Sequence, residues 1–415
     1  MCASVFGVGI IGAGVILQNH ALAYRSLPEM ARLIAVADID PSRAAAAKRE
    51  HGFQHSFVDY RDLLNRKDID VVSVCTPPHF HAPIVIDCLA AGKHVLCEKP
   101  ISRTLGEADQ TIKAAELHPQ LKLSIVYQYR TDPTHQRIRE MIRNESLGRI
   151  LMATLRVRAQ RTRAYYATAR GRGSWAIDGG GVLINQAVHQ LDSLISFLGA
   201  PVEVSAVMNT FLQPTEGEDT LVGWVRFENG AFAAIDCTVC AHEEWFAIEV
   251  LGENAQVAVR GEPGVQYCTW KVQSKSSAVQ RALYSSGLRD HPDLPKGPKR
   301  STELAQKLVC KLRGRQWMRP RHWGHTPHVK RFLESVASSQ PVPVGPREAR
   351  KSLELAVALY ASALNGEPVQ LPILSTHAFY DGIVPQTASN EPNKLNVPVG
   401  EDGGRVTLAP YTNRT

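Results

Sequence analysis

A strand, a glycine turn and a helix open the chain, and this succession constrains the fold more than any other feature of the sequence. Residues 5–11 are an apolar run typical of a buried strand. Gly12-Ala13-Gly14 follows as a tight turn, and apolar residues recur at helical spacing over 15–27. Backbone N–H groups at such a turn, and at the helix N-terminus behind it, can approach a pyrophosphate. These residues therefore predict a βα unit suited to a dinucleotide.

Two glycine patterns compete within this stretch. Gly7-x-Gly9-x-x-Gly12 matches the dinucleotide string, but its first two glycines lie inside the predicted strand. Gly12-x-Gly14 lies at the strand-to-helix turn, where close backbone approach is needed, so we prefer it. Its third position is Leu17 rather than Gly or Ala, which relaxes the packing of the helix on the strand. The cofactor-binding candidates here are Gly12, Gly14, Val15 and Ile16.

Strands and helices continue to alternate through the first third of the chain. We predict strands over 33–37, 71–75, 94–98 and 123–127, and helices over 41–49, 80–91 and 105–117. This alternation is typical of a mostly parallel, doubly wound sheet. The fold class is therefore α/β, with an N-terminal Rossmann domain over residues 1–128.

Residues at the predicted strand ends supply further candidates for cofactor binding. Asp38 ends the second strand, at about the distance where an acidic residue binds ribose hydroxyls. Its carboxylate would repel a 2′-phosphate, so NAD is favoured over NADP; the alternative is a helix-capping role. After the 71–75 strand the candidates are Thr76, Pro77, His79 and His81. Two histidines spaced two apart are a poor metal pair, and we predict no metal site.

Glu98-Lys99-Pro100 lies at the end of the buried strand over 94–98 and carries two charges to the edge where ligands bind. Proline fixes the backbone just after Lys99, which restricts the position of the amine. We therefore predict that Glu98 contacts the cofactor and that Lys99 is catalytic and contacts both cofactor and substrate. The alternative for Lys99 is a surface lysine after an edge strand.

A second polar group follows the glycine run Gly179-Gly180-Gly181. Asn185 and His189 are four residues apart on the predicted helix, and Asp192 lies seven from Asn185, so the three share a face. An isolated histidine on such a face would most often be solvated or satisfied. Alcohol oxidation by a nicotinamide, however, requires a proton acceptor beside the reacting carbon, which favours a catalytic role next to Lys99.

The stretch before this glycine run is rich in arginine and aromatic residues. Such an entrance suits a carboxylated or phosphorylated sugar, because arginine pairs with the anion and aromatic rings stack on the sugar. A basic surface strand with a loop is about as good an explanation for any single arginine. The substrate-binding candidates are Tyr127, Arg163, Tyr165, Arg172 and Trp175, together with Lys99, Asn185 and His189.

Several of these motifs together resemble the glucose-fructose oxidoreductase and inositol dehydrogenase family (Gfo/Idh/MocA). They are Gly12-Ala13-Gly14, Asp38, Thr76-Pro77 with His81, Ala91-Gly92-Lys93-His94-Val95 and Glu98-Lys99-Pro100. The resemblance implies an NAD-dependent dehydrogenase of a sugar, sugar acid or nucleotide sugar, in which Lys, Asp and His form the catalytic group. Here the Asp position is Asn185, so His189 must be oriented by another group. We expect His189 to take the hydroxyl proton and Lys99 to stabilise the oxygen, with Lys99 as the base in the rival assignment.

Two other functions remain compatible with these motifs. An NAD-using glycosidase of the same fold would oxidise one carbon transiently, let the glycosidic bond eliminate, and regenerate its cofactor. A non-catalytic sugar or NAD sensor would need neither Lys99 nor His189, so the presence of both counts against it.

From about residue 202 the apolar period changes to two, which predicts a large, mostly antiparallel open sheet. We assign residues 129–374 to an α+β substrate and oligomerisation domain, with helices from 182 and 347 on one face of its sheet. Helix 346–365 is expected to pack back on the first domain, and the other sheet face to form a homodimer or homotetramer. Residues 273–322 are predicted to be a basic insertion, and 375–415 a C-terminal arm or disordered tail.

The charge is concentrated in the insertion. Of a net charge of +7, the segment 296–321 carries nine Lys/Arg and one Glu, so the rest of the chain is near neutral and a nucleic-acid partner is not indicated. Its cationic helix over 301–312 could touch a membrane surface, but packing on an oligomer neighbour is the interpretation we prefer. No signal segment, no membrane-length apolar run and eight scattered cysteines predict a cytoplasmic protein.

Overall fold

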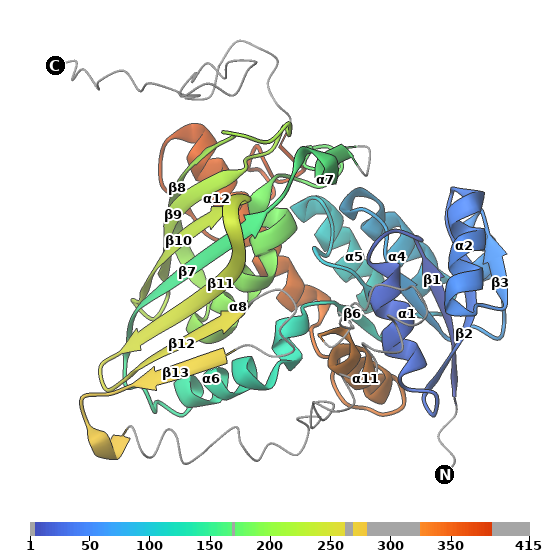
Figure 1. The fold of residues 1–415 in the computed structure, drawn as a ribbon, viewed down its shortest axis with the longest axis horizontal. Coiled ribbons are helices and arrows are strands. Elements are labelled where there is room, and N and C mark those ends of the chain that lie inside the picture. Colours follow the sequence, from blue (N-terminus) through green and yellow to red (C-terminus); the bar gives the residue numbers. More distant parts are fainter. Residues whose placement is uncertain (1–4, 168–170, 262–268, 280–323, 384–415) are drawn as a thin grey trace, which may run out of the picture. The chain divides into compact units, whose positions relative to one another are not determined.

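The first part of the chain forms the predicted parallel sheet. In this computed structural model six strands pair in the order β3-β2-β1-β4-β5-β6, and every pair is parallel. The strand order reverses beside β1, and ligands of such sheets bind at the carboxyl ends of the strands near that point (Figure 1). The strands are β1 (Phe6–Ile11), β2 (Ala31–Ala37), β3 (His55–Phe57), β4 (Val71–Val74), β5 (His94–Cys97) and β6 (Leu123–Ile125).

Helices connect these strands, and local capping explains where several of them begin. Asp40 accepts hydrogen bonds from the N–H groups of Ser42 and Arg43 at the start of α2, and Thr104 and Glu107 form a capping box at the start of α5. The predicted helix over 105–117 has the same bounds in the structure. The helices are α1 (Leu17–Arg25), α2 (Pro41–His51), α3 (Tyr60–Leu64), α4 (His81–Ala90) and α5 (Leu105–Leu117).

The second part contains the separate, mostly antiparallel sheet that the sequence predicts. Eight strands pair in the order β13-β12-β11-β7-β10-β9-β8-β14. The pair β7–β10 is parallel, and the other pairs are antiparallel. The strands are β7 (Ile150–Gln160), β8 (Pro201–Asn209), β9 (Thr220–Phe227), β10 (Phe232–Thr238), β11 (Cys240–Gly252), β12 (Gln256–Gly261), β13 (Thr269–Gln273) and β14 (Val369–Gln370).

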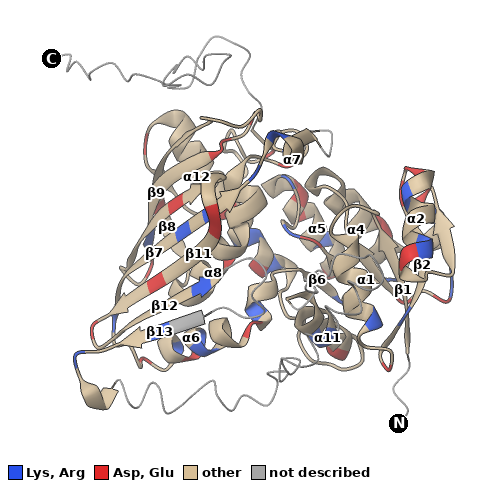
Figure 2. Ribbon diagram, viewed as in Figure 1, with Lys and Arg blue, Asp and Glu red and all other residues tan. Residues whose placement is uncertain are grey.

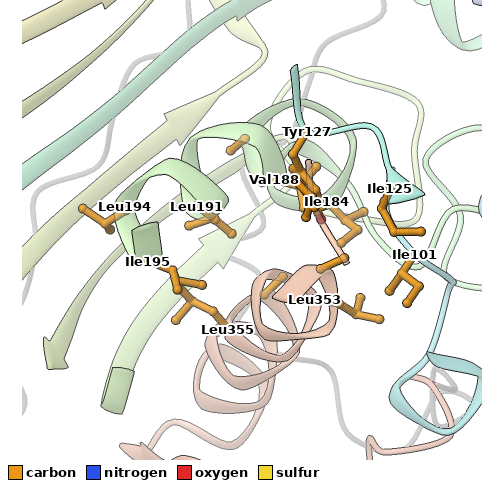
Figure 3. Packing of buried hydrophobic residues seen from close by; sticks show 14 of the residues in the cluster. Ile101, Ile125, Tyr127, Ile184, Val188, Leu191, Leu194, Ile195, Leu353 and Leu355 are labelled. Atoms are coloured by element: carbon orange, nitrogen blue, oxygen red, sulfur yellow. The ribbon is translucent and has the colours of Figure 1, made fainter. Parts of the chain in front are cut away.

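Helices α8 and α12 cover one face of this sheet. Apolar side chains from α8, from the segment before it and from α12 meet residues that follow β5 and β6 in one core; Ile184, Leu191, Leu353 and Ile101 are examples (Figure 3). Helix α12 therefore touches both β8 and α5. The remaining helices are α6 (Pro133–Arg143), α7 (Arg163–Ala167), the π-helix η3 (Leu183–Ala187), α8 (Val188–Leu198), α11 (His325–Val336) and α12 (Pro346–Asn365), with short 3₁₀ turns η1 (Pro78–Phe80) and η2 (Gln128–Thr131).

Helix α11 lies in the stretch that the sequence assigns to the second domain, but its apolar face packs on the first. Val329, Phe332 and Leu333 share a buried cluster with Leu17 and Tyr24 of α1. The structure describes residues 5–167, 171–261, 269–279 and 324–383, and these described residues belong to one compact unit. The boundary at 128 therefore stays a prediction. The basic helix over 301–312 and the tail beyond 383 lie outside the described residues.

Candidate active site

The glycine turn and Asp38 meet at the carboxyl ends of β1 and β2. Ala13 N–H donates to Asp38 Oδ2 at 2.7 Å, and Asp40 N–H donates to Asp38 Oδ1 at 2.9 Å. Gly12 has a φ of +98°, and a Cβ there would lie 2.7 Å from the backbone oxygen of Cys75. Glycine at position 12 is therefore required by both its conformation and its packing.

The surface around this turn fits a dinucleotide. A Cβ added at Gly14 would meet no atom within 4 Å, so the turn leaves room for a phosphate. Val15 and Ile39 flank the turn and Asp38, and their side chains are 83% and 88% exposed. Apolar side chains this exposed suit a flat apolar group such as a nucleobase. Ile39 could not be predicted as a site residue, because a single apolar residue after a strand-end acid is no signal by itself.

The loop after β4 presents polar atoms to the same region. Thr76 Oγ1 and His79 Nδ1 are buried without a hydrogen-bond partner among the described residues, so both can accept a bond from a ligand. His81 is buried, with its ring nitrogens 2.7 Å from the Pro100 oxygen and 2.8 Å from the Thr76 oxygen. Burial lowers the pKa of His81, and the neutral ring has one N–H, so it can donate to only one of these two oxygens.

Glu98 is buried at the end of β5, between two histidines that the sequence analysis missed. Its Oε1 lies 3.0 Å from His20 Nε2 and 3.3 Å from His325 Nε2. Although burial opposes ionisation, the hydrogen bonds from these two histidines hold the pKa of Glu98 well below its usual range. The three side chains are of metal-ligating types and lie close together. Two N–H donors to one carboxylate oxygen account for their contacts.

Lys99 reaches from the end of β5 to the segment that carries the second predicted group. Its Nζ donates to the backbone oxygen of Asn185 at 2.8 Å, across 86 positions of sequence. Burial lowers the pKa of Lys99, partly offset by the carboxylates of Glu98 and Asp178. The structure therefore brings two of the predicted catalytic residues, Lys99 and Asn185, into contact.

His189 lies at the start of α8 with its ring between the edges of two tyrosines. The rings of Tyr127 and Tyr129 make edge contacts with it, with centroids 5.9 Å and 5.8 Å away. Burial, and next the charge of Lys99, lower the pKa of His189 to about 3. The imidazole is therefore neutral at ordinary pH, and Lys99 is near enough to affect it.

The other two polar residues of the predicted helix face turn to different partners. Asn185 Nδ2 donates to Asp178 Oδ2 at 3.0 Å, and the buried Asp192 accepts two bonds from Arg130 at 2.6 Å and 2.9 Å. The expectation that Asn185, His189 and Asp192 share a face stays a prediction, and the carboxylate of Asp192 is already paired with Arg130. The π-helical turn before α8 changes the register that an α-helix would give.

The predicted substrate residues differ in exposure. Arg163 is exposed on α7, whereas Tyr165 and Arg172 are half-buried, with the Arg172 guanidinium 4.4 Å from the Tyr165 ring. Arg161, from the same arginine-rich stretch, donates to Gln186 Oε1 at 2.8 Å beside Asn185. Trp175 is only 8% exposed and packs edge-on against Tyr360 with centroids 5.0 Å apart. Stacking of Trp175 on a sugar would require this core contact to open.

Two family profiles match the chain. One, described as "Oxidoreductase family, NAD-binding Rossmann fold", matches residues 6–125. The other, described as the GFO/IDH/MocA C-terminal domain, matches residues 135–258. The first match covers the parallel sheet, and the second begins in α6 and reaches into β12.

Named relatives and solved structures agree with these profiles. The chain is 28% identical over 291 residues to levoglucosan dehydrogenase of Pseudarthrobacter phenanthrenivorans, covering 61% of this chain and 73% of the relative. It is 30% identical over 253 residues to D-glucoside 3-dehydrogenase of Escherichia coli, covering 55% and 69%. The crystal structure of the WlbA dehydrogenase from Bordetella pertussis with NADH and UDP-GlcNAcA is similar, with a TM-score of 0.73, 27% identity, and coverage of 89% and 100%.

Proposed function

The chain belongs to the GFO/IDH/MocA family of NAD-binding oxidoreductases, and from this premise we propose that it oxidises a secondary hydroxyl of a sugar, sugar acid or nucleotide-linked sugar. The observation that carries the proposal is the bond from Lys99 Nζ to the Asn185 oxygen. It joins the ligand edge of the dinucleotide sheet to the segment that leads into His189. NAD, when bound at the turn over Gly12 and Gly14, would supply the hydride acceptor.

The residues at this junction can move the hydroxyl proton. A general base works best when its pKa lies near the operating pH. His189, with a pKa of about 3, is a poor acceptor, whereas burial lowers the pKa of Lys99 from the high value of a free amine. We therefore assign Lys99, and not His189, as the general base that takes the hydroxyl proton. His189 then hydrogen-bonds the same oxygen and orients it.

The substrate class follows from the relatives and from the charges near Lys99. The relatives carry the names of dehydrogenases of levoglucosan and D-glucosides, and a similar structure contains UDP-GlcNAcA. Arg161, Arg163 and Arg172 lie on or near α7, and Arg161 is close enough to Lys99 to lower its pKa. Arg161 already pairs with Glu244, so the exposed Arg163 is the cation best placed to meet a carboxylate or phosphate on the sugar.

The activity test compares substrates first. Purified protein is incubated with NAD and a panel of uronates, nucleotide sugars, glucosides and polyols, and NADH is followed by absorbance together with sugar release. Net NADH formation with at least one sugar is the expected result. Sugar release without net NADH would instead indicate the glycosidase.

Variants of the two proposed catalytic residues test their roles. Lys99→Ala and His189→Ala should each lower turnover by about 100-fold or more. Added small primary amines should restore part of the Lys99→Ala rate, because they can accept the proton in place of Lys99, and should not restore His189→Ala. Near-wild-type rates in both variants would contradict the site. Amine rescue confined to His189→Ala would contradict the assignment of the base.

The open face of the eight-stranded sheet is the proposed oligomer contact. Val207, Val222, Trp224 and Phe232 are 36–70% exposed on β8, β9 and β10, although they are large and apolar. Such a patch on a sheet face suits a second copy of the chain as a homodimer or homotetramer. Among the described residues no helix could cross a membrane, and the cytoplasmic location stays a prediction.

A further inference from the structure

Glu218 is a buried carboxylate that the proposed chemistry does not use. It lies in the turn before β9, and its side chain is 2% exposed. Its Oε2 accepts a hydrogen bond from Gly181 N–H at 2.9 Å, and its Oε1 accepts one from Leu183 N–H at 2.8 Å. The Tyr360 hydroxyl of α12 also donates to Oε1, at 3.0 Å. The carboxylate therefore holds the start of the segment that carries Asn185 and His189.

The glycine run before this segment is shaped by the same contacts. A Cβ at Gly181 would lie 1.8 Å from the Glu218 backbone oxygen. A Cβ at Gly180, whose φ is +147°, would lie 2.4 Å from the Tyr360 hydroxyl oxygen. Side chains at either position would push Glu218 and Tyr360 away, so two of the three glycines permit the close approach of the groups that hold the segment.

The contacts of Glu218 reach the reacting groups through the backbone. Leu183 begins the π-helical turn η3, and the Asn185 oxygen in this turn accepts the bond from Lys99 Nζ. The Tyr360 hydroxyl oxygen accepts Ile184 N–H at 3.2 Å, which adds a third attachment of the same turn. A π-helical turn is rare and occurs frequently at functional sites, and here Glu218 and Tyr360 bind the N–H groups of its first two residues. Loss of the carboxylate would therefore let the Asn185 oxygen and His189 shift relative to Lys99.

We infer that Glu218 is a positioning residue: its carboxylate, with the Tyr360 hydroxyl, holds the η3 turn so that Lys99 and His189 face one substrate oxygen. This inference rests on the proposed function. Glu218 touches no substrate or cofactor atom in this account and acts through the backbone of residues 181–185. Among the described residues it forms no ion pair.

The first test compares Glu218→Gln with Glu228→Gln, an exposed residue at the other end of β9. Gln keeps the size of the side chain, but its NH₂ group replaces one of the two oxygens that accept the N–H groups of Gly181 and Leu183, so one of these hydrogen bonds is lost. We expect kcat of Glu218→Gln to fall about 10- to 100-fold, because a displacement of about 1 Å can cost that much. The KM for NAD should stay within twofold of wild type, because the cofactor turn is untouched. Glu228→Gln should match wild type in both. A kcat within twofold of wild type for Glu218→Gln would overturn the inference, as would an equal loss in Glu228→Gln.

A second arm keeps the inference testable if Glu218→Gln does not fold. Tyr360→Phe removes one donor to Glu218 and the acceptor of Ile184 N–H but keeps the ring on Trp175. It should lower kcat about tenfold with an unchanged KM for NAD, and unchanged turnover in this variant would count against the inference.

Hydrogen exchange separates this inference from the proposed function. Amides in the peptide over 181–187 should exchange at least tenfold faster in Glu218→Gln, or in Tyr360→Phe, than in wild type and Glu228→Gln. Peptides of β1 should be unchanged. If wild type oxidises no sugar, the proposed function fails while this readout still decides whether Glu218 holds the segment. Unchanged exchange over 181–187 would overturn the inference even if the enzyme is active.

Discussion

Glycine is needed in the first strand and in the first turn for different physical reasons. A Cβ at Gly7 would lie 1.8 Å from the Asp68 backbone oxygen, and one at Gly9 would lie 2.7 Å from the Leu63 side chain. These two glycines are therefore needed for packing within the protein. Gly14 faces open space, so its small size serves a ligand and not the fold. The geometry supports our preference for the Gly12-x-Gly14 pattern over the string that begins at Gly7.

Alanine substitutions separate these two reasons. Gly7→Ala should destabilise the protein by about 1–3 kcal/mol or more, because its methyl group meets a backbone oxygen that cannot move easily. Gly14→Ala should leave the melting temperature within about 1 °C and raise the Kd for NAD at least tenfold, because the added methyl group meets the pyrophosphate. Thermal unfolding and NAD titration measure both effects. Equal stability losses in the two variants would contradict the assignment of Gly14 to the cofactor.

Some site residues could be predicted from sequence and others could not. Lys99 could be predicted because two charges and a proline directly after an apolar strand have few structural explanations. His20 and His325 could not, because each is one polar residue in an amphipathic helix, and 305 positions of sequence separate them. What makes them a pair is their common contact with Glu98 Oε1, and a contact of this kind has no local pattern.

Helix α8 and its π-helical turn show how one element departs from a regular pattern. The turn over Leu183–Ala187 is wider than an α-helix and changes the position of Asn185 relative to His189, whereas His189 and Asp192 keep the regular spacing of three residues within α8. Asp192 instead receives Arg130 and the Ser352 hydroxyl, the latter at 3.1 Å. A buried carboxylate needs such partners, because leaving it unpaired costs several kcal/mol. Of the three residues, His189 is the one near enough to Lys99 for its pKa to be affected. Among the described hydrogen bonds it has no carboxylate partner.

Glu218, which holds this turn, should make the stability of the protein depend on pH. Burial raises the pKa of Glu218 to about 7, against an ordinary value near 4.5, although hydrogen bonds, among them those from Leu183, Gly181 and Tyr360, favour the ionised form. The charged or titratable groups that influence it are Tyr360 of α12 and Cys237 of β10. A carboxyl group with a higher pKa in the folded state stabilises that state at low pH and loses this contribution as pH rises through the folded pKa.

Stability should therefore fall with pH more steeply in wild type than in Glu218→Gln. Between pH 5 and pH 8, the free energy of unfolding of wild type minus that of the variant should decrease by about 2.5 kcal/mol. Urea unfolding at several pH values measures this difference, and the variant removes the contributions of all other groups. A difference that is constant over this range, or that rises with pH, would show that Glu218 ionises normally in the folded protein.

The two sheets of the molecule were predictable from a change in the pattern of apolar residues. Strand and helix patterns alternate in the first third of the chain, and from about residue 202 apolar and polar residues alternate one by one. Less predictable was which helix covers which sheet. Helix α11 packs on α1 because its stripe of Val329, Phe332 and Leu333 fits there, and any amphipathic helix of this length shows a similar stripe. Arg350 of α12 pairs with Asp109 of α5, which ties the end of the chain to the parallel sheet.

The open face of the large sheet carries charged as well as apolar residues, and the two kinds meet on neighbouring strands, where Asp236 of β10 lies directly opposite Val222 of β9. Figure 2 shows Lys, Arg, Asp and Glu on several strands of this sheet. On β7 and β10, Arg158 pairs with Asp236, whereas Val222 of β9 lies opposite Val207 of β8. The apolar end over β8 and β9 is therefore the part that a second copy would cover, with paired charges at its margin.

A charge placed within the apolar end should weaken the oligomer. Val222→Arg introduces a guanidinium opposite Asp236 of β10, whose carboxylate is already paired with Arg158, so a second copy would have to bury an excess positive charge, which typically costs several kcal/mol at an interface. Val58→Arg is the matched control, because Val58 is 54% exposed and Val222 is 48% exposed, and Val58 lies after β3 in the parallel sheet. Light scattering after gel filtration should give a dimer or tetramer mass for wild type and Val58→Arg and a lower mass for Val222→Arg. A monomeric wild type would contradict assembly through this face. An equal loss of mass in both variants would contradict it too, because the effect would then not depend on where the charge is placed.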